Sequence, residues 1–143
     1  MILLDTNVLL RLVSTSDSRY ERATRAIRKH VRLGDELVVF PQTVYELWTA
    51  ATRTKAVNGL ELSPADAASF VRRLRGRFRV IPDPPDLADT FIDFVERHAV
   101  TGPNAYGARL AAACEAHGVS AILTFNARDF HGLGLTVLEP DAV

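Results

Sequence analysis

The chain has 143 residues, a hydrophobic fraction of 48% and a charged fraction of 24%, a composition that indicates a globular domain and excludes a disordered chain. Its 17 basic and 17 acidic residues balance, so net charge alone does not indicate a nucleic-acid partner. The single cysteine, Cys114, excludes an internal disulfide framework, and no apolar run is long enough to span a membrane. The first residues lack the basic start of a signal peptide. We therefore expect one domain over residues 1–143, in the cytoplasm and not in a membrane.

Short apolar runs alternate with helical segments along the whole chain. The runs predict strands and the intervening segments, which have helical periodicity, predict helices. Alternation of this kind is typical of an α/β domain in which helices cover both faces of a mainly parallel sheet. We expect about five strands, at 1–5, 36–41, 79–82, 120–125 and 134–140, and helices at 18–34, 42–57, 63–78, 86–98 and 101–118.

Polar residues follow three of the predicted strands. Asp5 ends the first strand, Glu46 lies about one turn into the helix after the second, and Thr124, Asn126 and Asp129 follow the fourth. Ligands of parallel α/β sheets bind outside the carboxyl ends of the strands, and clustered carboxylates repel one another unless they are protonated or hold a cation. Oxygen ligands favour Mg²⁺ or Mn²⁺. The alternatives stay open: Asp5 as a helix N-cap, Glu46 as a solvated residue, and Asp129 as a turn cap.

A glycine interrupts the last predicted helix, "TGPNAYGARLAAACEAHG". Pro103 suits the first helical position and Gly118 suits a stop. Gly107 lies inside the first turns, where glycine costs about 1 kcal/mol relative to alanine. Helix formation therefore does not explain why a glycine occupies this position.

Four blocks of the sequence resemble the PIN-domain family, and most closely the VapC-type toxins of bacterial and archaeal toxin–antitoxin modules. The blocks are "LLDTNVLL" (3–10), "YELWTA" (45–50), "GARLAAACEAHGV" (107–119) and "ILTFNARDF" (122–130), and their order and spacing agree with the family. The resemblance implies a three-layer α/β/α fold, usually as a homodimer. It also implies an Mg²⁺- or Mn²⁺-dependent endoribonuclease, often acting on tRNA or rRNA, that a VapB-type antitoxin restrains.

The resemblance also assigns roles to individual residues. Asp5 matches the first family acid and Glu46 the second, both metal ligands, and Asp129 matches the variable fourth acid. The family usually reads "HDARLAA" where this chain reads "YGARLAA", so Gly107 stands at the place of the third acid. We therefore expect reduced or abolished activity, with the oxygen of Asn104, one turn earlier, as a partial substitute. The matching supporting residues are Asn7, which commonly holds the first acid, Thr124 and Asn126.

A basic stripe at helical spacing within 18–34 offers phosphate contacts for RNA, or is simply a solvated face. The stripe consists of Arg19, Arg22, Arg25, Lys29 and Arg32.

Two other functions compete with the ribonuclease. One is a non-catalytic PIN module that binds only antitoxin or RNA. The other is a phosphate-handling enzyme with Asp5 as nucleophile, against which Asn7 argues, because such phosphatases carry a second Asp at that place.

Overall fold

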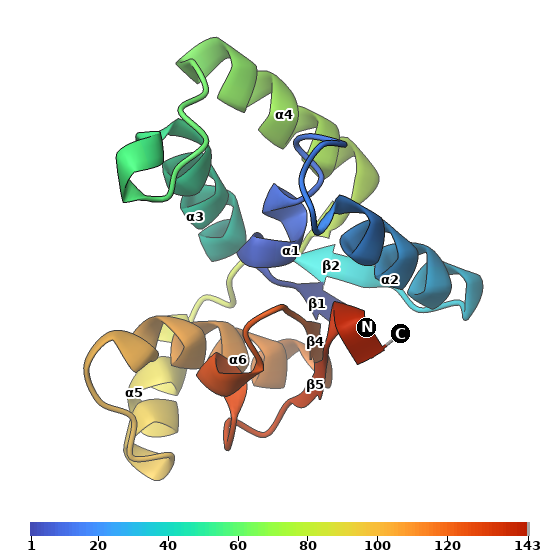
Figure 1. The fold of residues 1–143 in the computed structure, drawn as a ribbon. Coiled ribbons are helices and arrows are strands. Elements are labelled where there is room, and N and C mark those ends of the chain that lie inside the picture. Colours follow the sequence, from blue (N-terminus) through green and yellow to red (C-terminus); the bar gives the residue numbers. More distant parts are fainter. Residues whose placement is uncertain (143) are drawn as a thin grey trace.

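A parallel β-sheet forms the centre of the molecule (Figure 1). The structure is a computed structural model that describes residues 1–142. Within them the sheet has five strands in the order β3-β2-β1-β4-β5, and every neighbouring pair is parallel. The central strand β1 pairs on both sides, with Ile2 opposite Leu37 and also opposite Ala121. The strands are β1 (Ile2–Leu4), β2 (Leu37–Val39), β3 (Arg79–Val80), β4 (Ala121–Leu123) and β5 (Thr136–Leu138).

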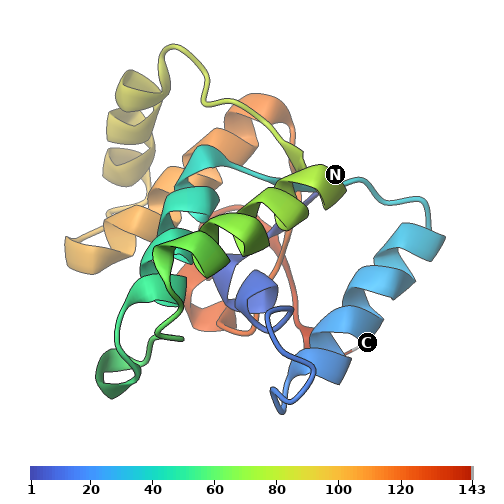
Figure 2. The same cartoon turned by 90° about the horizontal axis from the view of Figure 1, so that it is seen from above.

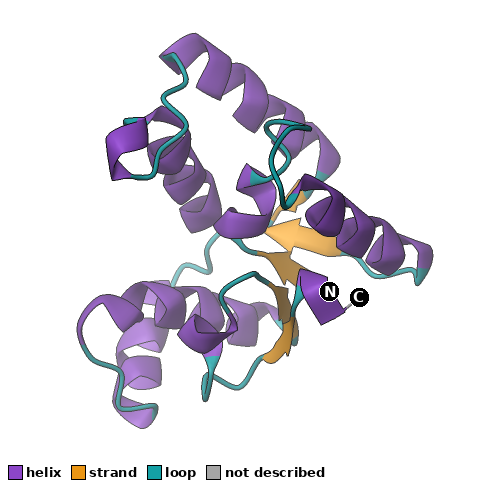
Figure 3. Ribbon diagram, in the orientation of Figure 1, coloured by secondary structure: helices purple, strands orange, loops and turns teal. Residues whose placement is uncertain are grey.

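Helices cover both faces of this sheet (Figure 3). Four of them pack over one face in a core that includes Ile2 and Leu4, and the other two pack over the opposite face around Leu3. The split follows from the period of two of a strand, which sends successive side chains of β1 to opposite faces. The expected α/β/α layering over a five-stranded sheet is confirmed. The first group is α1 (Thr6–Leu10), α2 (Tyr20–Arg32), α3 (Pro41–Thr52) and α4 (Pro64–Arg77), and the second is α5 (Leu87–Arg97) and α6 (Ala105–His117).

Two helix boundaries differ from the prediction. The helix expected over 42–57 ends at Thr52, and Lys55–Val57 forms a separate 3₁₀ turn, η1. The chain turns at Asn58 (φ 61°) and runs back along α3, so that the N–H groups of residues 60–62 donate to carbonyls of its last turn. A Cβ at Gly59 would overlap the Arg53 carbonyl, so this close return needs glycine. These contacts satisfy the end of α3 in place of a further helical turn.

The last helix starts later than the sequence predicts. Pro103 lies in a 3₁₀ turn, η2 (Gly102–Asn104), and α6 begins at Ala105, which makes Gly107 its third residue. The end is as expected, because Gly118 caps α6 with φ 67° in the left-handed region that glycine adopts freely. Cys114 is fully buried in α6, and burial raises its pKa to about 12, consistent with a core role. Among the helices of residues 1–142, none has the length and apolar character to cross a membrane.

Candidate functional site

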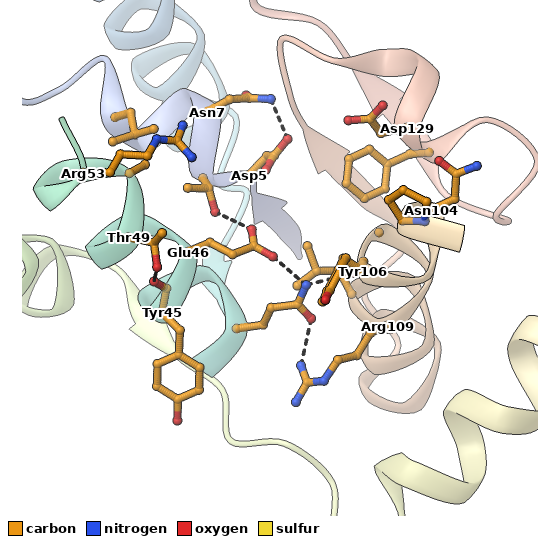
Figure 4. A pocket seen from close by; sticks show the side chains of 18 residues that line it. Asp5, Asn7, Tyr45, Glu46, Thr49, Arg53, Asn104, Tyr106, Arg109 and Asp129 are labelled. Atoms are coloured by element: carbon orange, nitrogen blue, oxygen red, sulfur yellow. Dashed lines mark hydrogen bonds between the residues drawn. The ribbon is translucent and has the colours of Figure 1, made fainter. Parts of the chain in front are cut away.

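A cleft of about 810 Å³ opens at the carboxyl end of β1, between α3 and α6. Six site residues singled out from the sequence line it: Asp5, Asn7, Glu46, Asn104, Gly107 and Asp129. Asp5 and Glu46 lie on one side, and Asn104 and Asp129 lie on the other (Figure 4). The topology therefore brings acids from three distant segments to one edge of the sheet, where parallel α/β folds bind ligands.

Asp5 is a buried carboxylate directly after β1, with 8% of its surface exposed. Its Oδ2 accepts hydrogen bonds from Thr124 Oγ1 at 2.6 Å and Asn7 Nδ2 at 2.7 Å. Burial raises its pKa to about 6, the hydroxyl of Thr124 opposes that rise, and the charge of Glu46 adds to it. Asp5 occupies the N-cap position of α1 but makes no capping hydrogen bond with its side chain. The structure therefore does not support the cap interpretation.

Glu46 reaches the same cleft from α3, and both of its carboxylate oxygens have partners. Oε2 accepts a hydrogen bond from Thr6 Oγ1 at 3.0 Å, and Oε1 accepts one from Gln42 Nε2 at 2.7 Å. Each donor comes from a helix next to the cleft, α1 or α3. Asp5 and Glu46 together therefore form a pair of like charges held by neutral donors, an arrangement that a cation would stabilise.

The opposite wall of the cleft is less complete. Gly107 has no side chain to offer, and a Cβ built on it would lie 3.1 Å from the carbonyl oxygen of Asp129 and 3.8 Å from Phe130 Cε1. The first distance is tight, so a side chain at position 107 requires the 3₁₀ turn η3 (Ala127–Phe130) to move by a few tenths of an ångström. Asp129 is an exposed member of that turn, and its Oδ2 accepts from Asn126 Nδ2 at 2.8 Å.

The donor set fits a divalent cation only in part. Asp5 and Glu46 supply the hard oxygen ligands that Mg²⁺ and Mn²⁺ prefer. Yet residues 1–142 contain no group of three or more His, Cys, Asp or Glu side chains placed to hold a metal ion. Position 107, which also lines the cleft, carries no acid. The side chains present therefore fit one weakly held ion.

The supporting residues taken from the sequence lie around Asp5. Asn7 donates to Asp5 and to Thr124 Oγ1 at 3.0 Å, while its Oδ1 accepts from the backbone N–H of Phe125 at 3.0 Å. The side chain of Asn7 thus ties α1 to the segment after β4. Asn126 donates its backbone N–H to Thr124 Oγ1 at 2.9 Å, so its side chain and main chain link Asp129 to the same network.

Three residues at the cleft were not selected from the sequence: Thr6, Gln42 and Arg109. Gln42 lies one turn before Glu46, so helical spacing alone offered a means of finding it. Thr6 directly follows Asp5, but the direction of its hydroxyl depends on how α1 packs on α3. Arg109 donates to Gln42 Oε1 at 2.9 Å from α6, and no local pattern indicates that contact.

The basic stripe begins at Arg19, the N-cap residue of α2, and continues along that helix, which is drawn in blue in Figure 2. Arg25 and Lys29 are exposed. Arg22 pairs with Asp141 at 2.7 Å, and the guanidinium carbons of Arg19 and Arg22 lie 5.5 and 5.6 Å from the ring centre of Phe125, within the range of a cation–π contact. The stripe is thus linked to the segment after β4 but lines no part of the cleft.

Comparison with known proteins decides the family. The family model described as "PIN domain" matches residues 2–134. The chain belongs to the PIN-domain family. Among curated proteins, none matches its sequence significantly, so the assignment rests on the family model and on the fold.

Solved structures with this fold are distant in sequence. FitAcB from Neisseria gonorrhoeae aligns with a TM-score of 0.71 at 20% identity, over 100% of both chains. VapBC2 from Rickettsia felis, bound to a DNA fragment from its promoter, aligns at 0.72 and 12% identity, over 97% of this chain and 98% of that one. VapC20 from Mycobacterium tuberculosis, a sarcin–ricin loop cleaving toxin, aligns at 0.58 and 18% identity, over 85% and 87%. At these identities the likeness shows the PIN fold alone.

Proposed function

We propose that this PIN-domain protein is a VapC-type toxin of a toxin–antitoxin module, built as a divalent-metal-dependent endoribonuclease, and that Gly107 reduces or abolishes its activity. The single observation that carries the proposal is the Asp5–Glu46 pair at the carboxyl edge of the sheet, with position 107 and Asp129 on the facing wall of the same cleft. Such a cleft is suited to hydrolysis of RNA phosphodiesters.

Asp5 and Glu46 would hold the Mg²⁺ or Mn²⁺ ion. When bound, the ion lowers the pKa of a bound water and neutralises charge on the phosphoryl oxygens. The chain's own contribution is to hold both carboxylates in fixed orientations. Thr124 and Asn7 hold Oδ2 of Asp5, while Thr6 and Gln42 hold the two oxygens of Glu46. This fixed geometry limits the reorganisation needed when substrate arrives.

The loss at position 107 explains why we expect weak activity. A third carboxylate would add a ligand and a negative charge from the first turn of α6, where the helix dipole favours an anion. Asn104 lies on the same wall and carries an amide oxygen, but a neutral oxygen attracts a cation less strongly than a carboxylate does. Two-ion occupancy therefore requires an acid that this chain does not have.

The partners follow from the same assignment. Two proteins with this fold have partners or targets in their names: a toxin–antitoxin complex from Klebsiella pneumoniae, with a TM-score of 0.66 at 21% identity, and VapC20, a sarcin–ricin loop cleaving toxin. We extend these partner classes to this chain: a VapB-type antitoxin, an RNA of the tRNA or rRNA class, and a second copy in a homodimer. The α2 stripe of Arg19, Arg22, Arg25 and Lys29 supplies candidate phosphate contacts.

Restoring the acid tests the proposal. Gly107→Asp should increase Mn²⁺-dependent cleavage of structured RNA by about 100-fold or more, because even residues behind a metal ligand change activity ~10–100-fold. It should also inhibit growth when expressed without an antitoxin. Adding Mn²⁺ should raise the melting temperature of the variant more than that of the parent chain, by mass action.

A matched glycine controls for changes unrelated to the site. Gly76 lies in α4, and a Cβ there meets nothing within 4 Å, so Gly76→Asp adds the same charge to a helix outside the cleft and should leave cleavage unchanged. Asp5→Asn added to Gly107→Asp should abolish the gain. No gain from Gly107→Asp, despite a folded protein, would favour the alternative of a non-catalytic PIN module that binds antitoxin or RNA.

A further inference from the structure

Gln42 makes three polar contacts at the base of the cleft, and they join its two walls. It is buried at the second position of α3, with 7% of its surface exposed. Its Nε2 donates to Glu46 Oε1 at 2.7 Å and to the backbone carbonyl of Tyr106 at 2.9 Å. Tyr106 is the residue before Gly107. One side-chain amide therefore connects Glu46 to the main chain beside position 107, and dashed lines near Glu46, Tyr106 and Arg109 in Figure 4 mark the hydrogen bonds of this group.

Arg109 determines which way this amide faces. Its Nη1 donates to Gln42 Oε1 at 2.9 Å, and a guanidinium can only donate. The carboxylate of Glu46 and the carbonyl of Tyr106 can only accept. A rotated Gln42 would place its oxygen against two acceptors and its amino group against a donor. The arginine thus leaves one orientation in which every contact on the amide is a hydrogen bond.

Asp83 in turn holds Arg109. Its Oδ2 lies 2.6 Å from Arg109 Nη2, and each side chain is about 30% exposed (31% for Arg109 and 29% for Asp83). The two nitrogens at the tip of Arg109 therefore have different partners: one is fixed to the segment after β3 and the other to α3. A lysine at this position lacks the planar fork that makes both contacts at once. The chain of contacts runs from Asp83 through Arg109 and Gln42 to Glu46.

We propose that Gln42, oriented by Arg109, is a positioning residue that sets the separation between Glu46 and residue 107, and so determines whether an acid at 107 can share a cation with Glu46. This inference rests on the proposed function. It differs from the role of Thr6, which also holds Glu46 but, within residues 1–142, makes no side-chain hydrogen bond to α6. The Arg109–Gln42 tie remains intact in this chain although the third acid is absent.

A double-mutant cycle on Mn²⁺ affinity, measured by calorimetry, tests this. The first change is Gly107→Asp and the second is Gln42→Met, which keeps the length of the side chain and removes the amide. We expect the gain in Mn²⁺ affinity from Gly107→Asp to fall about tenfold when Gln42→Met is present, the size typical of a hydrogen bond to a charged group. Arg109→Met should reduce the gain in the same direction, because Gln42 is then free to rotate.

Metal-free melting temperatures and a control on α3 separate positioning from simple stability. If Gln42 is purely structural, Gln42→Met should lower the melting temperatures of the parent chain and of the Gly107→Asp variant equally. The gain in Mn²⁺ affinity from Gly107→Asp would then be unchanged, and this result would overturn the inference. Thr52 bonds only to the Trp48 carbonyl of its own helix, at 2.8 Å, so Thr52→Ala should change neither quantity. If Gly107→Asp gives its full gain in Mn²⁺ affinity in the Arg109→Met background, Arg109 does not orient Gln42.

Crystal structures of Gln42→Met and Arg109→Met distinguish failure of this inference from failure of the proposed function. We expect the Glu46 carboxylate and the Tyr106 carbonyl to move apart in both variants and not in Thr52→Ala. Unchanged separation overturns the positioning role even if Gly107→Asp restores metal binding. Increased separation, without any gain from Gly107→Asp in the parent chain, supports the positioning role and contradicts the nuclease proposal.

Discussion

The two walls of the cleft differ in how completely they are built. On the wall formed by α1 and α3, Asp5 and Glu46 accept four side-chain hydrogen bonds in the described chain. On the wall formed by α6 and η3, position 107 carries no side chain, and Asp129 bonds to Asn126 at the surface. Under the proposed function, this contrast is what is expected of a site that keeps its supporting hydrogen bonds after losing a ligand. The supporting contacts also hold the fold together, whereas a metal ligand contributes only when the metal is bound.

The largest effect on stability is expected at Asp5, on the wall formed by α1 and α3. Burial raises the pKa of Asp5 to about 6 from 3.8, so the folded state binds more protons than the unfolded state between these values. Stability therefore falls as pH rises through about 6, by about 3 kcal/mol in total at ~1.4 kcal/mol per pKa unit. In the absence of metal at pH 7.5, Asp5→Asn should raise the free energy of unfolding by up to about 3 kcal/mol, because the asparagine oxygen can still accept from Thr124 and Asn7.

Urea unfolding at several pH values measures this effect. The gain should disappear below about pH 4, where the carboxyl is protonated in both states, and a given concentration of Mn²⁺ should stabilise the parent chain more than the variant. Asp89→Asn removes one charge from an exposed position on α5 and controls for net charge. A gain from Asp5→Asn that is the same at pH 4 and pH 7.5 would contradict the electrostatic cause.

The next prediction compares the acids of the two walls. Asp5→Asn should weaken Mn²⁺ binding about tenfold, whereas Asp129→Asn should weaken it less than about threefold, because a buried charge acts through a lower effective dielectric than an exposed one. Calorimetry on both variants measures their Mn²⁺ dissociation constants, and the ratio of the two constants compares the acids. Equal losses would mean that η3 moves Asp129 into the site when the ion binds, and would remove the asymmetry between the walls.

The smallest effect concerns the space at position 107. Replacing a helical glycine by alanine stabilises by up to about 1 kcal/mol where the Cβ is unobstructed. Gly76→Ala should show this gain, and Gly107→Ala should show clearly less, because its Cβ would lie 3.1 Å from the Asp129 carbonyl. Thermal unfolding of the two variants compares them directly. An equal gain in stability at both positions would mean that η3 moves away from the new Cβ without a measurable loss of stability.

Much of the fold was predictable because its cause is local. Apolar runs separated by helical segments predict parallel strands with crossover helices, and all five strands were found. Helix ends were less predictable where tertiary contacts replaced local ones. The return of residues 60–62 along α3 ends that helix at Thr52, and the 3₁₀ turn containing Pro103 delays α6. Neither contact has a sequence pattern of its own.

By itself, the sequence determined the parallel α/β architecture and the edge of the sheet at which Asp5, Glu46, Gly107 and Asp129 meet. Carboxyl ends of parallel strands share one edge, so position along the chain implies position in space. Only the tertiary structure decided which of these acids are held together. The direction of a side chain across a cleft depends on how the helices on its two walls are placed, and hydrogen bonds between α3 and α6 hold Gln42 beside Tyr106 while it also donates to Glu46. The same placement leaves Asp129 with Asn126 and position 107 against a carbonyl oxygen.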